Sequence, residues 1–260
     1  MARNLYNRRW VLAEFPESMP KASHFLLEEN LPLTPLEDNQ ILVQACYLSV
    51  DPYMRGRISP TAGYTAGVEP GGLMPAGGVG EIIESRSDLF TVGEFVESMN
   101  FGWQEYSVLS VDGVQKVDPS LAPIQSSLSY LGMPGMTAFF GLFEVGAARP
   151  GETVLVSAAS GAVGQVVGQL AKRHGCRAVA VASNNEKLNW CREIGYDAGV
   201  NYRQLENLPK AIGESCPDGV DVYFDNIGGP IHRSEEHMSE LQSLVNLVCR
   251  LRLEKKKYIA

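Results

Sequence analysis

The residues that decide the fold run from Val154 to Cys176 and read VLVSAASGAVGQVVGQLAKRHGC. An apolar run typical of a buried strand leads into a turn of small residues, and a helix with valines at helical spacing follows at once. A dinucleotide fold needs small residues there, because main-chain N–H groups must approach the pyrophosphate and the helix must pack close to the strand. The positive end of the helix dipole then faces the phosphates. The predicted cofactor turn comprises Ala158, Ala159, Ser160, Gly161, Ala162, Val163 and Gly164.

This turn departs at one position from the usual G-x-G-x-x-G pattern, because Ala159 stands where the first glycine is expected. The order of strand, turn, helix and second strand nevertheless supports a dinucleotide site. The alternative is a helix start rich in Gly and Ala that is packed this way for steric reasons alone.

The end of the next strand indicates which nicotinamide nucleotide binds. A site selective for NAD places an Asp or Glu there, where it bonds the ribose 2′-hydroxyl. This chain instead has Ser183, Asn184 and Asn185, followed by Glu186 and Lys187. Neutral side chains and one ammonium accommodate a 2′-phosphate, which a carboxylate would repel. The sequence therefore predicts NADPH as the cofactor; the alternative for Lys187 is an ordinary solvated helix lysine.

The rest of the chain divides into two kinds of pattern. Up to about residue 125, short β-type runs such as ILVQACYLSV, GGVGEIIES, FVESM and EYSVL alternate with stretches rich in Gly and Pro. From about residue 150, apolar strands alternate with helical patterns, which is typical of a parallel sheet wrapped by helices. The expected fold class is therefore α/β, with a β-rich domain followed by a doubly wound sheet. Between them, a helix containing Leu131, Met133, Phe139 and Phe140 is expected to pack on both parts.

Composition and charge limit the possible partners. The 260 residues are 45% hydrophobic, with a formal net charge of −8 and a pI near 5.1, which argues against nucleic acid or an anionic membrane surface. The amino terminus lacks the apolar region of a signal peptide, and no apolar run approaches the ~20 residues of a bilayer span. The five cysteines form no C-x-x-C pair, which favours free thiols in a reducing compartment. We expect a soluble, cytoplasmic protein.

Several independent segments together resemble one family. These are NRRWVLAEFP, YLSVDPYMRGR, LGMPGMTAFFGL, AASGAVGQVVGQLAK and VDVYFDNIGG, between residues 7 and 229. They resemble the zinc-free, NADPH-dependent double-bond reductases of the medium-chain dehydrogenase/reductase superfamily. The resemblance implies a GroES-like catalytic domain over residues 1–125 and a Rossmann domain over residues 126–232. It also implies reduction of α,β-unsaturated ketones or aldehydes, small-molecule substrates, and a possible homodimer.

The resemblance assigns further cofactor residues. The turn, Lys187, Tyr202 and Asn226 would bind NADPH, with Lys187 and Tyr202 holding the 2′-phosphate. Ser183 stands where relatives often have Gly, so its contact is the least certain to carry over. Pro52 and Tyr53 would lie at the cofactor and substrate cleft, with Tyr53 as a substrate-positioning hydroxyl.

No metal is expected. Zinc-dependent relatives carry a Gly-His-Glu motif, whereas the comparable stretch here reads PAGGVGEIIE, and no histidine has ligand-like spacing with a cysteine. The histidines considered are His24, His174, His232 and His237. Without a Lewis acid, the enolate formed by hydride addition would be stabilised by hydroxyl donors.

The family pattern stops near His232, and residues 233–260 are expected to be a foreign or non-family tail. The start of this tail, RSEEHMSELQS, resembles the translated frame of a sequencing-adapter oligonucleotide. The alternative is a native amphipathic helix, with its apolar positions at Leu241, Leu244, Val245, Val248 and Leu251. On either interpretation the family pattern ends after the fourth strand of the sheet, which predicts an open apolar edge and a chain that is at best a weak NADPH binder with little or no turnover.

Two other functions stay open at this point. A quinone reductase would have the same architecture and the same cofactor. A non-catalytic nucleotide-binding protein is also compatible, because a fold does not fix a function.

Overall fold

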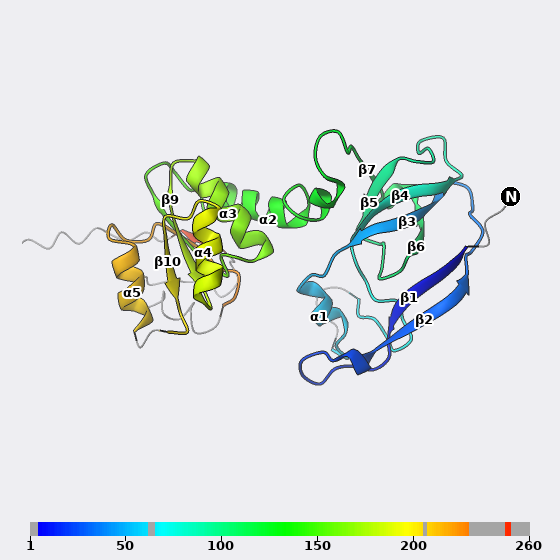
Figure 1. Ribbon diagram of the computed structural model, residues 1–260, viewed down its shortest axis with the longest axis horizontal. Helices are drawn as coiled ribbons and strands as arrows, with labels where there is room; N and C mark the ends of the chain where they lie inside the picture. Colours follow the sequence, from blue (N-terminus) through cyan, green and yellow to red (C-terminus); the bar gives the residue numbers. More distant parts are fainter. Residues whose placement is uncertain (1–4, 62–65, 205–206, 229–247, 251–260) are drawn as a thin grey trace, which may run out of the picture. The chain divides into compact units, whose positions relative to one another are not determined.

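The computed structural model describes residues 5–61, 66–204, 207–228 and 248–250. The chain divides into two compact units, Met1–Leu128 and Ser129–Ala260, and each is described here by itself (Figure 1). The described ranges contain no helix with both the length and the apolar character needed to cross a bilayer.

The first unit is built from antiparallel strands. Strands β1 (Tyr6–Leu12) and β2 (Phe25–Pro32) form a two-stranded sheet, while the second sheet has the order β6-β3-β4-β5-β7. The strands of this second sheet are β3 (Gln40–Leu48), β4 (Gly78–Ser85), β5 (Phe95–Ser98), β6 (Tyr106–Ser110) and β7 (Gln115–Val117). Its buried core contains Ile41, Val43, Ile82, Val96 and Phe101. The four β-type runs predicted from the sequence are therefore confirmed, whereas β1, β2 and β7 were not predicted.

Short helical turns connect these strands. They are η1 (Ala22–His24), α1 (Tyr53–Arg57), η2 (Val111–Gly113) and η3 (Ile124–Leu128). Helix α1 is held by the buried Met54 and by Arg55, whose Nη2 donates to the carbonyl oxygens of Pro16 (3.3 Å) and Ser18 (3.0 Å). These contacts hold the short helix that begins at Tyr53 against the rest of the unit.

The second unit contains the parallel sheet that the sequence predicts. Its strand order is β10-β9-β8-β11-β12, and the first four strands run parallel. These strands are β8 (Thr153–Ser157), β9 (Arg177–Ala182), β10 (Ala198–Asn201) and β11 (Val222–Phe224). The helices are α2 (Met133–Phe140), the π-helical η4 (Gly141–Val145), α3 (Ala162–Arg173), α4 (Asn185–Glu193) and α5 (Leu208–Ser215).

Apolar residues on both faces of this sheet explain the two helix layers. Val154, Val156 and Phe224 pack with Val167 of α3 and Leu188 of α4 on one face. On the other face, Leu155, Val179 and Tyr223 pack with Ile212 of α5. A β-rich unit and a parallel sheet with helices on both faces fit the predicted α/β fold class.

The connecting helix differs from the prediction in the residues that pack. Ala138 and Leu142 are fully buried in the core beside α3, whereas Leu131, Met133, Phe139 and Phe140 are exposed. The physical reason is size, because the small Ala138 fits into the core beside α3, whereas the larger side chains of α2 do not.

The sheet edge also differs from the prediction. Strand β12 (Val248–Arg250) pairs antiparallel with β11, so the β11 edge is covered along Val222–Phe224 and the expectation of an open edge after four strands was wrong. Val248 lies in this strand, which contradicts its place in the alternative tail helix. The other predicted positions of that helix, and residues 229–247 as a whole, lie outside the described residues.

Candidate dinucleotide-binding site

The predicted cofactor turn lies where the buried strand β8 meets helix α3. Gly161 N–H donates to the carbonyl oxygen of Ala158 (2.8 Å), which closes the turn, and Ala159 N–H donates to Val181 of β9 (3.3 Å). Ala158 adopts a left-handed conformation with a φ of 45°, which costs a non-glycine residue of order 1–3 kcal/mol. Ala159, at the place of the first glycine, is buried and has no positive φ, which explains why an alanine is accepted there.

Gly164 sets the close approach of α3 to the turn. A Cβ atom on Gly164 would lie 2.5 Å from the carbonyl oxygen of Ala158 and 2.8 Å from the Cα of Ala159. Both neighbours are backbone atoms that cannot rotate away, so only glycine fits. This is the role that the sequence motif assigns to its last glycine.

Tyr196 and Gly168 support this packing and were not predicted. The hydroxyl of Tyr196 donates to the carbonyl oxygen of Gly164 (2.7 Å), and a Cβ on Gly168 would lie 2.1 Å from the Tyr196 ring. Burial raises the pKa of Tyr196 well above its ordinary value, so the hydroxyl stays protonated as a donor. A second glycine at helical spacing after Gly164 was the available sequence signal.

The amino-terminal end of α3 differs from those of α4 and α5. Asn184 and Asn207 cap those two helices by accepting from backbone N–H groups, at 2.9 Å and 3.0 Å. Gly161 at the start of α3 supplies no side-chain cap. The first-turn N–H groups of α3 can therefore donate to a bound anion, which the helix dipole also favours.

The residues predicted to hold a 2′-phosphate follow two neighbouring strands. Ser183 follows β9 and Tyr202 follows β10, and the N–H of Tyr202 donates to the carbonyl oxygen of Ala182 (3.2 Å). Lys187 Nζ lies 3.4 Å from Ser183 Oγ, and no salt bridge to a carboxylate is present for this lysine within the described ranges. The structure thus brings Ser183 and Lys187 together, with Tyr202 on the adjacent strand end.

Asn226 belongs to a polar clamp that joins the ends of β8 and β11. Its Nδ2 donates to the carbonyl oxygen of Ser157 (2.8 Å), and its backbone N–H donates to Ser157 Oγ (2.7 Å). The Ser157 hydroxyl donates in turn to Asp225 Oδ1 (2.8 Å). The clamp fixes the orientation of the Asn226 amide and leaves its Oδ1 as the group available to a ligand.

Asp225 is a buried carboxylate that the sequence analysis missed. Burial raises its pKa, but N–H groups of Gly228 (2.9 Å) and Ile227 (3.0 Å) and the Ser157 hydroxyl stabilise the ionised form, so the net pKa is lowered. Ser157 and Asp225 are the polar residues at the ends of two apolar strands, which was the signal available.

Pro52 and Tyr53 lie in the other unit, at the start of α1. The Tyr53 side chain is half-buried, and burial together with the nearby Asp51 raises the pKa of its hydroxyl, which therefore stays protonated near neutral pH. Their predicted place at a cofactor cleft stays a prediction.

Metal-ligating side chains do not gather anywhere in the described residues. No group of three or more His, Cys, Asp and Glu there could hold an ion. His232 and His237 lie outside the described residues. Cys46, Cys176, Cys191 and Cys216 are free thiols, as predicted.

Two family models match the chain, one in each unit. Residues 8–117 match the N-terminal domain of oxidoreductase, and residues 162–236 match a model described as zinc-binding dehydrogenase. The described residues do not fit the zinc of that description, so no chemical step through a metal is derived.

Named relatives and solved structures agree with these models. The E. coli NADPH-dependent curcumin reductase is 40% identical over 86% of this chain and 65% of its own length. The NADP-dependent 2-alkenal reductase of Nicotiana tabacum is 38% identical over 88% of this chain and 68% of its own length. CurA from Vibrio vulnificus, solved with NADPH, has a TM-score of 0.79 at 33% identity and covers 87% of this chain and 67% of that one.

The chain therefore belongs to the double-bond reductases of the medium-chain dehydrogenase/reductase superfamily. It spans only 64% of the Bacillus subtilis oxidoreductase YfmJ, to which it is 44% identical, and 65% of the curcumin reductase. For that reason, activity and substrates are treated as proposals.

Proposed function

We propose that the protein binds NADPH and reduces the carbon–carbon double bond of α,β-unsaturated ketones or aldehydes. The observation that carries the proposal is the turn at residues 158–164, where Gly164 admits no side chain and α3 begins without a side-chain cap. Relatives named as curcumin, prostaglandin and alkenal reductases support the substrate class.

The residues present fit NADPH in three places. The turn and the first N–H groups of α3 would hold the pyrophosphate. Lys187, Ser183 and Tyr202 would hold the 2′-phosphate, because they supply a cation and two hydroxyls. Residues 183–185, at the end of β9, contain no carboxylate that would repel a phosphate. The Oδ1 of Asn226 would accept a hydrogen bond from the cofactor beyond the pyrophosphate.

When bound, NADPH supplies a hydride for the β-carbon of the enone. The protein's task is then to stabilise the negative charge that develops on the carbonyl oxygen of the substrate. Tyr53 would supply a hydroxyl for this, because a phenol is protonated at neutral pH and can donate a hydrogen bond. A donated hydrogen bond lowers the energy of the enolate before the α-carbon is protonated.

Titration of the protein with NADPH and NADH, followed by calorimetry, tests the cofactor assignment. We expect NADPH to bind more tightly by about 10-fold or more, the factor that ~1.4 kcal/mol gives. Tighter binding of NADH, or no binding of either, would overturn the proposal.

The acceptor is tested by following NADPH oxidation with an alkenal, an enone and a quinone. The proposal expects oxidation with the first two to exceed that with the quinone. A reversed order would support the quinone reductase alternative, and binding without oxidation by any acceptor would support a non-catalytic role.

The Tyr53→Phe variant tests the proposed hydroxyl donor directly. Loss of one donor to a developing oxyanion should lower kcat by ~10²-fold or more, while the substitution keeps the aromatic ring that would contact NADPH. Unchanged turnover together with unchanged enone affinity would remove Tyr53 from the substrate site.

The cellular location and the assembly are also proposed. The free thiols support a cytoplasmic location, and the family resemblance supports a homodimer that acts on small molecules. Gel filtration with light scattering tests the dimer, and a monomer at micromolar concentration would contradict it.

A further inference from the structure

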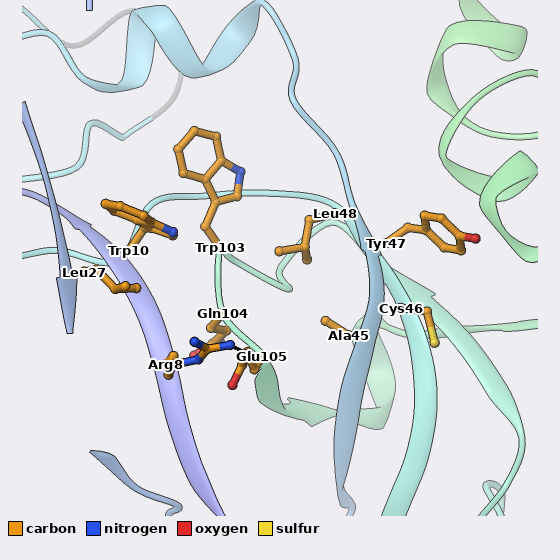
Figure 2. A pocket seen from close by; sticks show the side chains of 10 residues that line it. All are labelled: Arg8, Trp10, Leu27, Ala45, Cys46, Tyr47, Leu48, Trp103, Gln104 and Glu105. Atoms are coloured by element: carbon orange, nitrogen blue, oxygen red, sulfur yellow. Dashed lines mark hydrogen bonds and ion pairs between the residues drawn. The ribbon is translucent and has the colours of Figure 1, made fainter. Parts of the chain in front are cut away.

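A cavity of about 450 Å³ lies wholly within the first unit and shares no residue with the proposed NADPH site (Figure 2). Cavities of this size are typical of small-molecule sites. Its lining consists of Arg8, Trp10, Leu27, Ala45, Cys46, Tyr47, Leu48, Trp103, Gln104 and Glu105.

Backbone hydrogen bonds hold the segment 103–105, which forms part of the cavity lining. Trp10 N–H donates to the carbonyl oxygen of Trp103 (2.8 Å), and Glu105 N–H donates to Arg8 (3.0 Å). Ala45 of β3 donates to the carbonyl oxygen of Glu105 (2.8 Å), so the segment 103–105 is bonded on both sides. The segment 103–105 therefore offers no free strand edge to an added peptide, which favours a small molecule as the occupant.

Two indole rings form the apolar wall. Trp10 lies opposite Leu27 in the β1–β2 pair, and Trp103 is backed by Phe25, with 5.9 Å between ring centroids. The Nε1 of Trp103 donates to the carbonyl oxygen of Ser49 (3.2 Å), so this ring is held in place. Figure 2 shows Leu48 between the indoles and β3. A flat ring can therefore stack on the fixed Trp103 indole at little entropic cost.

A bulge in β3 shapes the opposite side. The pairing shifts between Ala45 and Tyr47, so Cys46 is the additional residue of the bulge. In Figure 2, the side chains of Cys46 and Tyr47 point away from the two indoles. The bulge thus turns the thiol outward and leaves Ala45 and Leu48 to face the aromatic wall.

The polar end of the cavity is the solvent-exposed Arg8–Glu105 ion pair. Arg8 Nη2 is bonded to Glu105 Oε1, and its Nη1 lies 3.8 Å from Glu29. The Arg8 guanidinium lowers the pKa of Glu105, which is therefore ionised near neutral pH. The Gln104 amide does not contribute to ligand binding, because it is already hydrogen-bonded to Asn7, Phe101 and Ser107. A carboxylate beside a guanidinium offers both an acceptor and donors, which suits a neutral hydroxyl or amide.

We propose that this cavity is a binding site for a neutral, flat aromatic molecule that carries a hydroxyl or amide group. The aromatic ring stacks against Trp10 and Trp103, and the polar group bonds the Arg8–Glu105 pair. The site is independent of the proposed cofactor, so it binds its ligand in the absence of NADPH.

Three probes that share the naphthalene ring and differ in their polar group test the wild-type protein: naphthol, naphthoate and naphthylmethylammonium. Binding is measured by calorimetry without NADPH. We expect naphthol to bind about 10-fold more tightly than either charged analogue, because each analogue would place a like charge beside one member of the ion pair. Equal or tighter binding of a charged analogue, or no binding of naphthol, would overturn the proposal.

The Arg8→Met variant provides a sharper test, because it leaves the Glu105 carboxylate unpaired. The order of the probes should then change, with naphthylmethylammonium becoming the tightest binder. The matched control is Lys116→Met, which breaks the comparably exposed Lys116–Glu94 pair (2.7 Å) outside the cavity and should leave the order unchanged. An unchanged order in Arg8→Met would contradict the proposed contact.

The aromatic wall is tested by Trp10→Ala against Trp190→Ala. The two indoles are similarly exposed, at 42% and 46%, but Trp190 lies in the second unit. We expect Trp10→Ala to weaken naphthol binding by about 10-fold and Trp190→Ala to leave it unchanged. Equal effects of the two substitutions would overturn the stacking role, and thermal melts verify that each variant is folded.

Discussion

Gly164 sets the distance between helix α3 and the turn at residues 158–161, because it has a hydrogen atom where every other residue has a Cβ. A Gly164→Ala substitution places Cβ 2.5 Å from the Ala158 oxygen, so α3 must move away from β8. We expect the free energy of unfolding to fall by about 1–3 kcal/mol. NADPH affinity should fall as well, since the N–H groups that face the pyrophosphate move with the helix. Urea denaturation and calorimetry measure the two effects.

Gly213 in α5 is the matched control for this substitution. A Cβ there meets nothing within 4 Å, so Gly213→Ala should stabilise the helix by up to about 1 kcal/mol and leave NADPH binding unchanged. If both alanine variants behaved alike, close packing at Gly164 would not be the reason for its glycine.

Lys187 is expected to act on the phosphorylated cofactor only. In Lys187→Met, NADPH affinity should fall by about 10-fold or more while NADH affinity stays unchanged, since only NADPH carries the 2′-phosphate. Lys210→Met, on the exposed face of α5, is the control and should change neither. An equal loss for both nucleotides would mean that Lys187 supports the fold rather than the phosphate.

The sequence pattern predicts residues such as Gly164 because the constraint is local. Tyr196 and Gly168 escaped prediction because their contact joins α3 to the segment after α4, and no local pattern reveals which tyrosine meets which glycine. The same reason applies to Trp10 and Trp103, which strand pairing brings together from distant parts of the chain.

At the scale of elements, the Ser157–Asp225–Asn226 clamp ties β8 to β11. Because the pKa of Asp225 is lowered in the folded protein, its stabilising effect is fully present above its ordinary value of 3.8 and is lost as the pH falls through the folded value. We expect Asp225→Asn to lower the free energy of unfolding by about 1–3 kcal/mol at neutral pH. The difference from wild type should shrink as the pH falls below about 4.

Urea denaturation between about pH 7 and pH 3 measures this dependence. The control is Asp218→Asn, at an exposed carboxylate, which should leave the unfolding free energy unchanged across the range. A difference between Asp225→Asn and wild type that stays constant with pH would show that the charge of Asp225 does not stabilise the clamp.

The predictable elements are those whose apolar pattern is buried in a regular way. β8, β9 and β10 read as apolar runs because helices cover both faces of their sheet. β1 and β2 alternate with charged residues and lack so clear a signal, and β12 depends on pairing with a strand more than 20 residues earlier in the chain. Ser157 and Asp225 are 68 positions apart in the sequence, so no local pattern reveals their hydrogen bond. Only Asn226 was predicted, from the FDNIGG segment that the family shares.

At the scale of the whole molecule, two units with separate cores can respond separately to two ligands. Hydrogen–deuterium exchange read by mass spectrometry follows each segment in the same experiment. NADPH should slow exchange in residues 158–168 and 183–188 of the second unit, where the turn and Lys187 lie. Naphthol should slow exchange in residues 8–12 and 103–106 of the first unit, where the cavity lies.

The segment 52–57 decides whether both units contribute to cofactor binding. If Pro52 and Tyr53 contact NADPH as expected from the family resemblance, this segment should be protected by NADPH and not by naphthol. NADH at the same concentration is the control and should protect every segment less, because ligand stabilisation grows as RT ln(1 + [L]/Kd) and its Kd is expected to be larger. Protection of 158–168 without 52–57 would confine the nucleotide to the second unit and remove Tyr53 from its surroundings. Protection of 103–106 by NADPH would instead show that the nucleotide occupies the aromatic cavity, which would contradict the independence of the two sites.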